Sequence, residues 1–153
     1  MPRGDRALPE TCIARLRTAD AILHAGDLTA VEVLELLESF GPPVHAVHGN
    51  VDEPELRMRL PAVRVVEADG ARILITHDAG PAAGRLDRLR RRFAEMEADA
   101  VVFGHSHMPL HEEREGFHIF NPGSPTERRR APGHTMGMAT ARAGTLKFEL
   151  VAL

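Results

Sequence analysis

The chain has 153 residues, of which 43% are hydrophobic, and its formal net charge at pH 7 is −3. This length and composition suit one globular domain over residues 1–153 and give no electrostatic reason to expect a nucleic-acid or membrane partner. The single cysteine, Cys12, excludes an intrachain disulfide and fits a reducing compartment. Because no apolar run is long enough to cross a bilayer, we expect a cytoplasmic protein.

Short apolar runs alternate with longer amphipathic segments in the first half of the chain, which is the pattern of an α/β fold. A helix near the N-terminus places Cys12 on one face with Ile13 and Leu16, which predicts a buried structural thiol. The segments that follow are a strand over 20–27, a helix over 30–41, a strand over 44–50, a short helix or loop over 53–61 and a hairpin over 64–78.

The second half begins with a strongly charged helix over 82–97, whose Leu86, Leu89 and Phe93 are expected to face inward. Its run of arginines is interpreted as a solvated face rather than as an anion site. The remaining segments are all strand-like, and they lie at 99–107, at 117–124 and in a closing hairpin over 134–153.

Polar residues able to bind a metal ion follow four separate strand-like runs. They are Asp27, Asn50, His77, and His105 with His107. Ligands in α/β folds gather at the carboxyl ends of strands, where the loops diverge and leave a crevice. Taken alone, the pair of histidines in GHSH fits a surface loop equally well, but the four strand ends together predict a metal site.

Glycines precede these candidate ligands at three of the strand ends. Gly26, Gly49 and Gly104 each stand where the chain turns sharply off a strand. Such a turn needs either a positive φ or a close approach of two backbone segments, and glycine permits both.

The motif series LHAGD, GNVD, THD, GHSH and NPGS resembles the calcineurin-like metallophosphoesterase superfamily, and most closely its small bacterial and archaeal phosphodiesterases. The resemblance runs from about Leu8 to the end of the chain. It implies an α/β fold, a β-sandwich of two mixed sheets flanked by helices, and a two-metal hydrolase.

The resemblance also implies a role for each matching residue. Asp27 would bridge the two metal ions and, with Asn50, would take part in catalysis. Asn50, His77 and His105 would complete one metal site, and His107 would belong to the other. The mixed carboxylate, amide and imidazole set suits a divalent ion, with Mn²⁺ preferred and Zn²⁺, Fe, Ni²⁺ or Co²⁺ as alternatives. His24 is expected beside the site without being a ligand, and the remaining histidines are interpreted as structural or surface residues: His45, His48, His111, His118 and His134.

Two features depart from the family pattern. The family opens with a strand that ends in Asp-x-His and holds the first metal ion, and neither residue of this motif is present before Asp27 at the matching position. We therefore expect Met1 to be an internal methionine, the first strand to be missing, and this chain to retain one ion where the full-length form holds two.

Many members also place a histidine, as a general acid, where this chain has Val51, although the small phosphodiesterases commonly lack it. Asp52 is assigned either to orienting a ligand or to capping the following helix.

These features predict a metal-dependent phosphoesterase, and more finely a phosphodiesterase that cleaves a small phosphate ester with a metal-activated hydroxide. The alternative is a non-catalytic protein-binding scaffold with a degraded metal site, as in the retromer subunit built on the same fold. Retention of Asn50, His77, His105 and His107 favours the enzyme. A surface for stacking nucleobases is not expected, because the chain has neither Trp nor Tyr, and homo-oligomerisation is left open.

Overall fold

The computed structural model describes residues 7–153, so the expectation about Met1 falls outside the described residues. The elements in chain order are α1 (Glu10–Thr18), β1 (Ile22–His24), α2 (Val31–Glu38), β2 (Val44–Ala46), α3 (Pro54–Arg59), β3 (Val63–Ala68), β4 (Ala71–Thr76), α4 (Arg85–Arg92), a 3₁₀ turn (Ala94–Met96), β5 (Ala100–Phe103), β6 (Leu110–Arg114), β7 (Phe117–Asn121), β8 (Thr135–Arg142) and β9 (Thr145–Ala152). Within this part of the chain, no helix is long and apolar enough to span a lipid bilayer.

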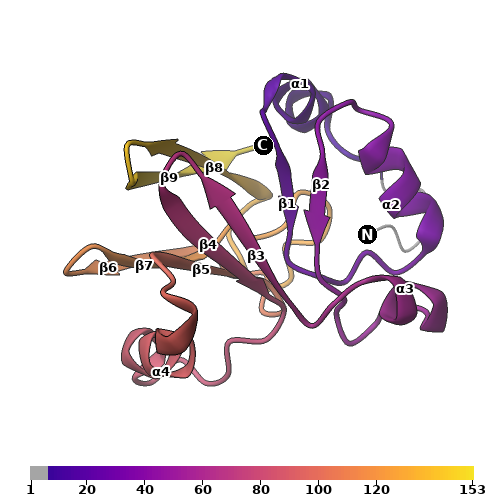
Figure 1. Ribbon diagram of the computed structural model, residues 1–153. Helices are drawn as coiled ribbons and strands as arrows, with labels where there is room; N and C mark the ends of the chain where they lie inside the picture. The colour runs from indigo at the N-terminus through magenta and orange to yellow at the C-terminus, as the bar shows by residue number, and fades with distance from the viewer. Residues whose placement is uncertain (1–6) are drawn as a thin grey trace.

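The central sheet is mixed and has the strand order β3-β4-β5-β7-β6. Strands β4, β5 and β7 run parallel, while β3 and β6 are antiparallel edge strands. The α/β fold with a central mixed sheet flanked by helices is therefore confirmed (Figure 1). Among residues 7–153, the four strands outside the central sheet are hydrogen-bonded as two separate pairs, β1 with β2 and β8 with β9.

The central sheet is covered on both faces, which explains why β5 is an unbroken apolar run. On one face, Leu74 and Val101 pack against Leu86 and Leu89 of α4. On the opposite face, residues of β4, β5 and β7 pack against Leu146 and Phe148 of β9. Figure 1 shows α4 on the side of the sheet away from the β8–β9 hairpin, and helices α1 to α3 beside the β1–β2 pair.

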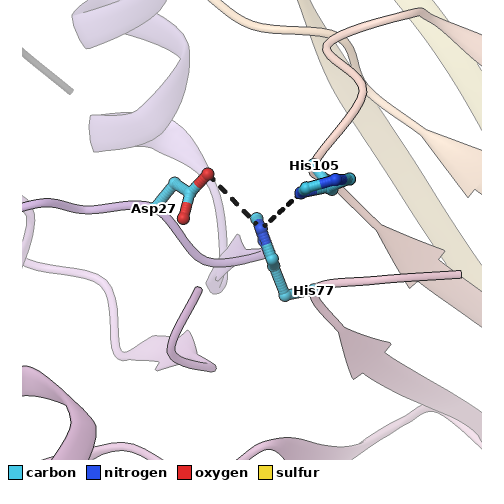
Figure 2. A group of neighbouring side chains, drawn as sticks. All are labelled: Asp27, His77 and His105. Carbon is cyan, nitrogen blue, oxygen red and sulfur yellow. Dashed lines mark hydrogen bonds and ion pairs between the residues drawn. The ribbon is translucent and has the colours of Figure 1, made fainter. Parts of the chain in front are cut away.

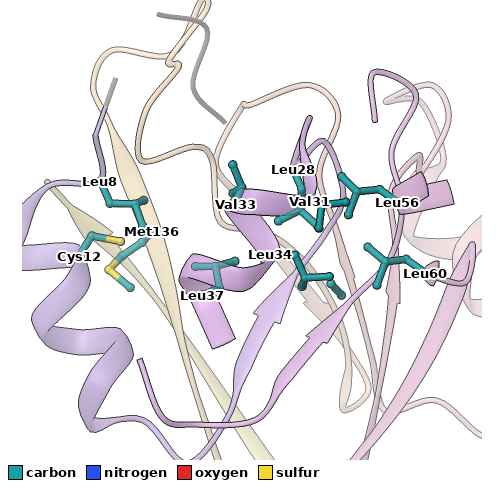
Figure 3. Packing of buried hydrophobic residues seen from close by; sticks show 11 residues of the cluster. Leu8, Cys12, Leu28, Val31, Val33, Leu34, Leu37, Leu56, Leu60 and Met136 are labelled. Carbon is teal, nitrogen blue, oxygen red and sulfur yellow. The ribbon is translucent and has the colours of Figure 1, made fainter. Parts of the chain in front are cut away.

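A second apolar cluster joins helices α1, α2 and α3 to the strands beside them (Figure 3). Cys12 lies in it with a side chain that is 2% exposed, next to Met136 of β8. Burial raises the pKa of the Cys12 thiol, which disfavours the reactive thiolate. The interpretation of Cys12 as a structural thiol is confirmed.

Two elements differ from the expectation. Strand β6 was not predicted, because four of its five side chains are exposed and it shows no apolar alternation; its pairing with β7 defines it. The helix expected over 82–97 ends at Arg92, although Leu86, Leu89 and Phe93 are buried as predicted. Part of its arginine run is structural rather than solvated, since Arg88 donates hydrogen bonds to the carbonyls of residues 79, 81 and 83.

Candidate metal centre

Four of the predicted ligands meet where strands of different sheets end. Asp27 follows β1, Asn50 follows β2, His77 comes directly after β4, and His105 follows β5. The ligand atoms of Asp27, His77 and His105 all lie within 4.8 Å of one another, and Figure 2 shows the three side chains pointing toward a common centre. The loops that follow these strands converge, and they therefore bring together residues that are far apart in the sequence.

Asn50 completes this group. Its Oδ1 atom lies 2.9 Å from His77 Nε2 and 3.0 Å from His105 Nδ1. The same Nε2 atom is 3.3 Å from Asp27 Oδ2 and 3.2 Å from His105 Nδ1. Two oxygens and two imidazole nitrogens thus share one small space, and they are the donor types that a divalent transition ion binds.

The backbone sets which nitrogen of His77 faces this space. Its Nδ1–H donates to the carbonyl of Ala25 at 2.7 Å, so Nε2 is turned toward Asp27 and Asn50. A hydrogen bond from the outer nitrogen to a carbonyl is the usual support of a metal-binding histidine, because it orients the ring and strengthens it as a ligand. The donor set therefore fits a metal ion, held by Asp27, Asn50, His77 and His105.

The electrostatics of the group favour a cation. Burial alone would raise the pKa of Asp27, but hydrogen bonds from His77 and from the backbone N–H of Val51 lower it to about 2. Burial alone would lower the pKa of His77, but its bonds to Asp27 and to the Ala25 carbonyl outweigh burial and raise it. The Asp27 carboxylate is consequently ionised at neutral pH and attracts positive charge into the group.

Close packing of two loops explains the glycines that precede the ligands. A Cβ atom on Gly49 would lie 2.1 Å from Asp27 Oδ1 and 2.3 Å from the Asp27 backbone nitrogen. A Cβ on Gly26, whose φ is +89°, would lie 2.6 Å from His77 Nδ1. Glycine is thus required at both positions, at Gly49 for close approach and at Gly26 for close approach and conformation together.

Asp52 joins the two loops that carry Asp27 and Asn50. Its carboxylate accepts hydrogen bonds of 2.6 Å from the backbone N–H groups of Thr29 and Gly49. Asp52 does not cap the next helix, because Glu53 is the residue that directly precedes α3 and no side chain caps this helix. Asp52 therefore supports the site by holding the loops together rather than by contacting a ligand side chain.

His107 lies near the group of four ligands but is not part of it. Its Nδ1–H donates to the carbonyl of Glu127 at 2.6 Å, and burial lowers its pKa, so that the neutral imidazole predominates at pH 7. With Asp27 and His105, it lines a cavity of about 200 Å³ that extends toward the apolar side chains of Leu8 and Met136.

The loop that carries His105 is held by a residue that sequence reasoning did not single out. Asn121, which is completely buried, donates from Nδ2 to the Gly104 carbonyl at 2.9 Å and to Ser106 Oγ at 3.2 Å. Its Oδ1 accepts from the N–H of Gly123 at 2.9 Å. The available signal was the asparagine that opens the NPGS motif at the end of a strand.

The other histidines lie outside the group, in line with their predicted roles. His111 and His118 are hydrogen-bonded to each other across β6 and β7, with 3.0 Å between Nε2 and Nδ1. His45 is a half-buried residue of β2. His24 lines the cavity beside Asp27, and its buried Nδ1 has no hydrogen-bond partner among residues 7–153.

We expect the His24 imidazole to make the protein less stable at mildly acidic pH. Burial, the largest cause, lowers the pKa of His24 from 6.5 to about 4. Because the folded pKa lies below the unfolded one, this contribution is fully present above pH 6.5 and is lost as the pH falls toward 4, by at most about 3 kcal/mol. Urea unfolding of the metal-free protein at pH 7 and pH 4.5 should show this loss, and His24→Gln should reduce it. An equal loss in the variant would assign it to other groups.

Comparison with known proteins agrees with this geometry. The calcineurin-like phosphoesterase superfamily domain matches residues 4–144. A probable metallophosphoesterase of Methanothermobacter thermautotrophicus is 37% identical over 127 residues, which cover 82% of this chain and 73% of that protein.

Two solved structures are similar in fold, at identities that carry no more than the fold. Wild-type Vps29 of Entamoeba histolytica, complexed with Zn²⁺, covers 99% of this chain and 93% of its own, with a TM-score of 0.77 and 23% identity. A structure described as that of a novel archaeal phosphodiesterase covers 93% of this chain and 90% of its own, with a TM-score of 0.71 and 18% identity. Because the family domain matches nearly the whole length of this chain, the chain belongs to the calcineurin-like phosphoesterase superfamily.

Proposed function

We propose that the protein is a metal-dependent phosphodiesterase. The observation that carries the proposal is the shared space of Asp27 Oδ2, Asn50 Oδ1, His77 Nε2 and His105 Nδ1, a donor set for a divalent ion. The relationship to a probable metallophosphoesterase supports a metal-dependent phosphoesterase, and a protein described as an archaeal phosphodiesterase has the same fold. Mn²⁺ is the proposed ion, and Zn²⁺, Fe, Ni²⁺ and Co²⁺ are the alternatives.

The proposed ligand roles follow from the positions of the side chains. Asp27, Asn50, His77 and His105 would hold one ion, while His107, together with Asp27, would contribute to a second at the adjoining cavity. When bound, the metal supplies Lewis acidity, which lowers the pKa of water and neutralises charge on phosphoryl oxygens.

Asn50 is proposed to act on the substrate as well. Because its Oδ1 is turned toward His77 and His105, the amide Nδ2 on the other side of the same group is available as a hydrogen-bond donor. A donor at this rim would bind a phosphoryl oxygen, and it would stabilise charge that develops there during displacement at phosphorus.

The site offers no acid at the position where many family members carry one. Val51, which is 37% exposed and lines the cavity, cannot transfer a proton. Asp52 is a poor replacement, because both of its carboxylate oxygens accept hydrogen bonds from backbone N–H groups, those of Thr29 and Gly49. The departing oxygen would therefore leave without protonation by either residue.

Hydrolysis of a series of aryl methyl phosphodiesters in the presence of Mn²⁺ tests this proposal. We expect the rate to rise steeply as the phenol becomes more acidic, since a general acid is worth roughly 10²–10⁴-fold and its absence penalises poor leaving groups. A rate that does not depend on phenol pKa would show that a general acid is present after all. If no diester is cleaved by protein that holds its metal, the non-catalytic scaffold is the correct alternative.

A further inference from the structure

Arg129 lies at the mouth of the cavity that contains the metal-binding group. It lines this cavity together with Asp27, His105 and His107. Its guanidinium donates one hydrogen bond, of 2.8 Å from Nη1, to the backbone carbonyl of His105. The contact anchors one corner of the guanidinium beside the metal-binding group and leaves its other N–H groups available at the mouth.

Arginines are concentrated around Arg129, although the carboxylates of Asp27 and Glu127 line the same cavity. Arg128, Arg129 and Arg130 are consecutive and exposed, and none of them forms an ion pair with an acidic side chain among residues 7–153. Their segment contains one acidic residue, Glu127.

The backbone holds Arg129 in an unfavourable conformation. Its φ is +48°, a left-handed value that costs energy in a residue with a Cβ atom. The part of the loop that precedes Arg129 is nevertheless fixed, by the hydrogen bond from His107 to the Glu127 carbonyl and by the N–H groups of Thr126 and Glu127, which donate to Ser124 Oγ. The strained segment is thus held against the cavity by contacts with a ligand-bearing loop.

We propose that Arg129 forms an anion subsite, which binds a second phosphate group of the substrate beside the phosphodiester that is cleaved. A guanidinium offers several N–H donors in a planar fork that matches phosphate oxygens, and the neighbouring arginines add long-range attraction. The preferred substrate class is then a diester that carries a terminal phosphate in addition to the reacting group. This inference rests on the proposed phosphodiesterase function.

A pair of synthetic substrates tests the subsite by kinetics. Both are 4-nitrophenyl alkyl phosphodiesters with the same leaving group, and the alkyl chain ends in a hydroxyl in one and in a phosphate in the other. We expect the wild type to have a higher kcat/KM for the phosphate-terminated ester and Arg129→Gln to reduce this preference roughly 10- to 100-fold, the value of hydrogen bonds to a charged group. Arg129→Lys should restore part of the preference, while Arg91→Gln, at an exposed arginine of α4, should leave it unchanged.

A binding measurement separates failure of the subsite from failure of the proposed function. Propane-1,3-diol bisphosphate is titrated into the metal-free protein and binding is followed by NMR; Arg129→Gln should weaken it and Arg91→Gln should not. Such Arg129-dependent binding by a protein that cleaves neither ester would keep the subsite and overturn the phosphodiesterase. Cleavage of both esters with the same preference in wild type and Arg129→Gln would overturn the subsite. The Mn²⁺ affinity of Arg129→Gln should match that of the wild type, because Arg129 bonds to the backbone carbonyl of His105 and not to a ligand atom. A lost affinity would show that Arg129 only supports the loop.

Discussion

His77→Ala is expected to abolish retention of the metal ion and, with it, Mn²⁺-dependent hydrolysis. The substitution removes Nε2, which lies within 3.3 Å of ligand atoms from Asp27, Asn50 and His105. It also removes the bond of 2.7 Å to the Ala25 carbonyl. Loss of supporting contacts alone weakens metal binding by roughly 10- to 100-fold, so removal of a ligand should exceed that loss.

Elemental analysis after dialysis against Mn²⁺ or Zn²⁺ measures this effect. The wild-type chain is expected to retain one ion, and the same value is expected for His45→Ala, whose imidazole lies on β2 outside the group. Retention of an ion by His77→Ala would place the metal elsewhere. Two tightly held ions in the wild type would mean that another residue completes a second site, and none would mean that the donor set is vestigial.

Gly49→Ala is expected to disrupt the site almost as strongly, although Gly49 has no side chain to bind anything. The added Cβ would lie 2.3 Å from the backbone nitrogen of Asp27, and this nitrogen cannot move without its whole loop. The β1 loop would therefore have to shift, which would displace the Asp27 carboxylate and strain the two hydrogen bonds that Asp52 makes. Overpacking of this kind costs about 1–3 kcal/mol of stability, and more where only backbone atoms oppose it.

Gly133→Ala is the matched control for this substitution. A Cβ atom at Gly133 would meet no atom within 4 Å, and its backbone does not need a positive φ. Thermal unfolding and Mn²⁺ binding should both be impaired in Gly49→Ala and be close to wild type in Gly133→Ala. Normal metal binding in Gly49→Ala would show that the β1 and β2 loops can separate without moving the ligands.

Much of the candidate site was readable from local patterns. Asp27, Asn50, His77 and His105 each follow a short apolar run, and the rule that loops at strand ends share a crevice brings them together before any coordinates are known. The buried face of α4 and the thiol of Cys12 followed from helical periodicity for the same reason, because burial repeats with a period that the sequence displays.

Other features depend on contacts between residues distant in sequence, which local patterns do not encode. Strand β6 exists because it pairs with β7, since its own exposed side chains carry no strand periodicity. The hydrogen bond from the Thr29 N–H to Asp52 and the one from Arg129 to the His105 carbonyl each join residues more than twenty positions apart.

The sequence by itself thus determined which chemical groups lie at the strand ends, because alternation and turn residues act over a few neighbouring positions. Only the tertiary structure decided the distances at which four of these groups meet, that His107 faces the adjoining cavity, and that a buried Asn121 holds the loop that carries His105. These outcomes depend on the packing of separate loops to within hydrogen-bond distance, and such distances are set by the whole fold rather than by any one segment.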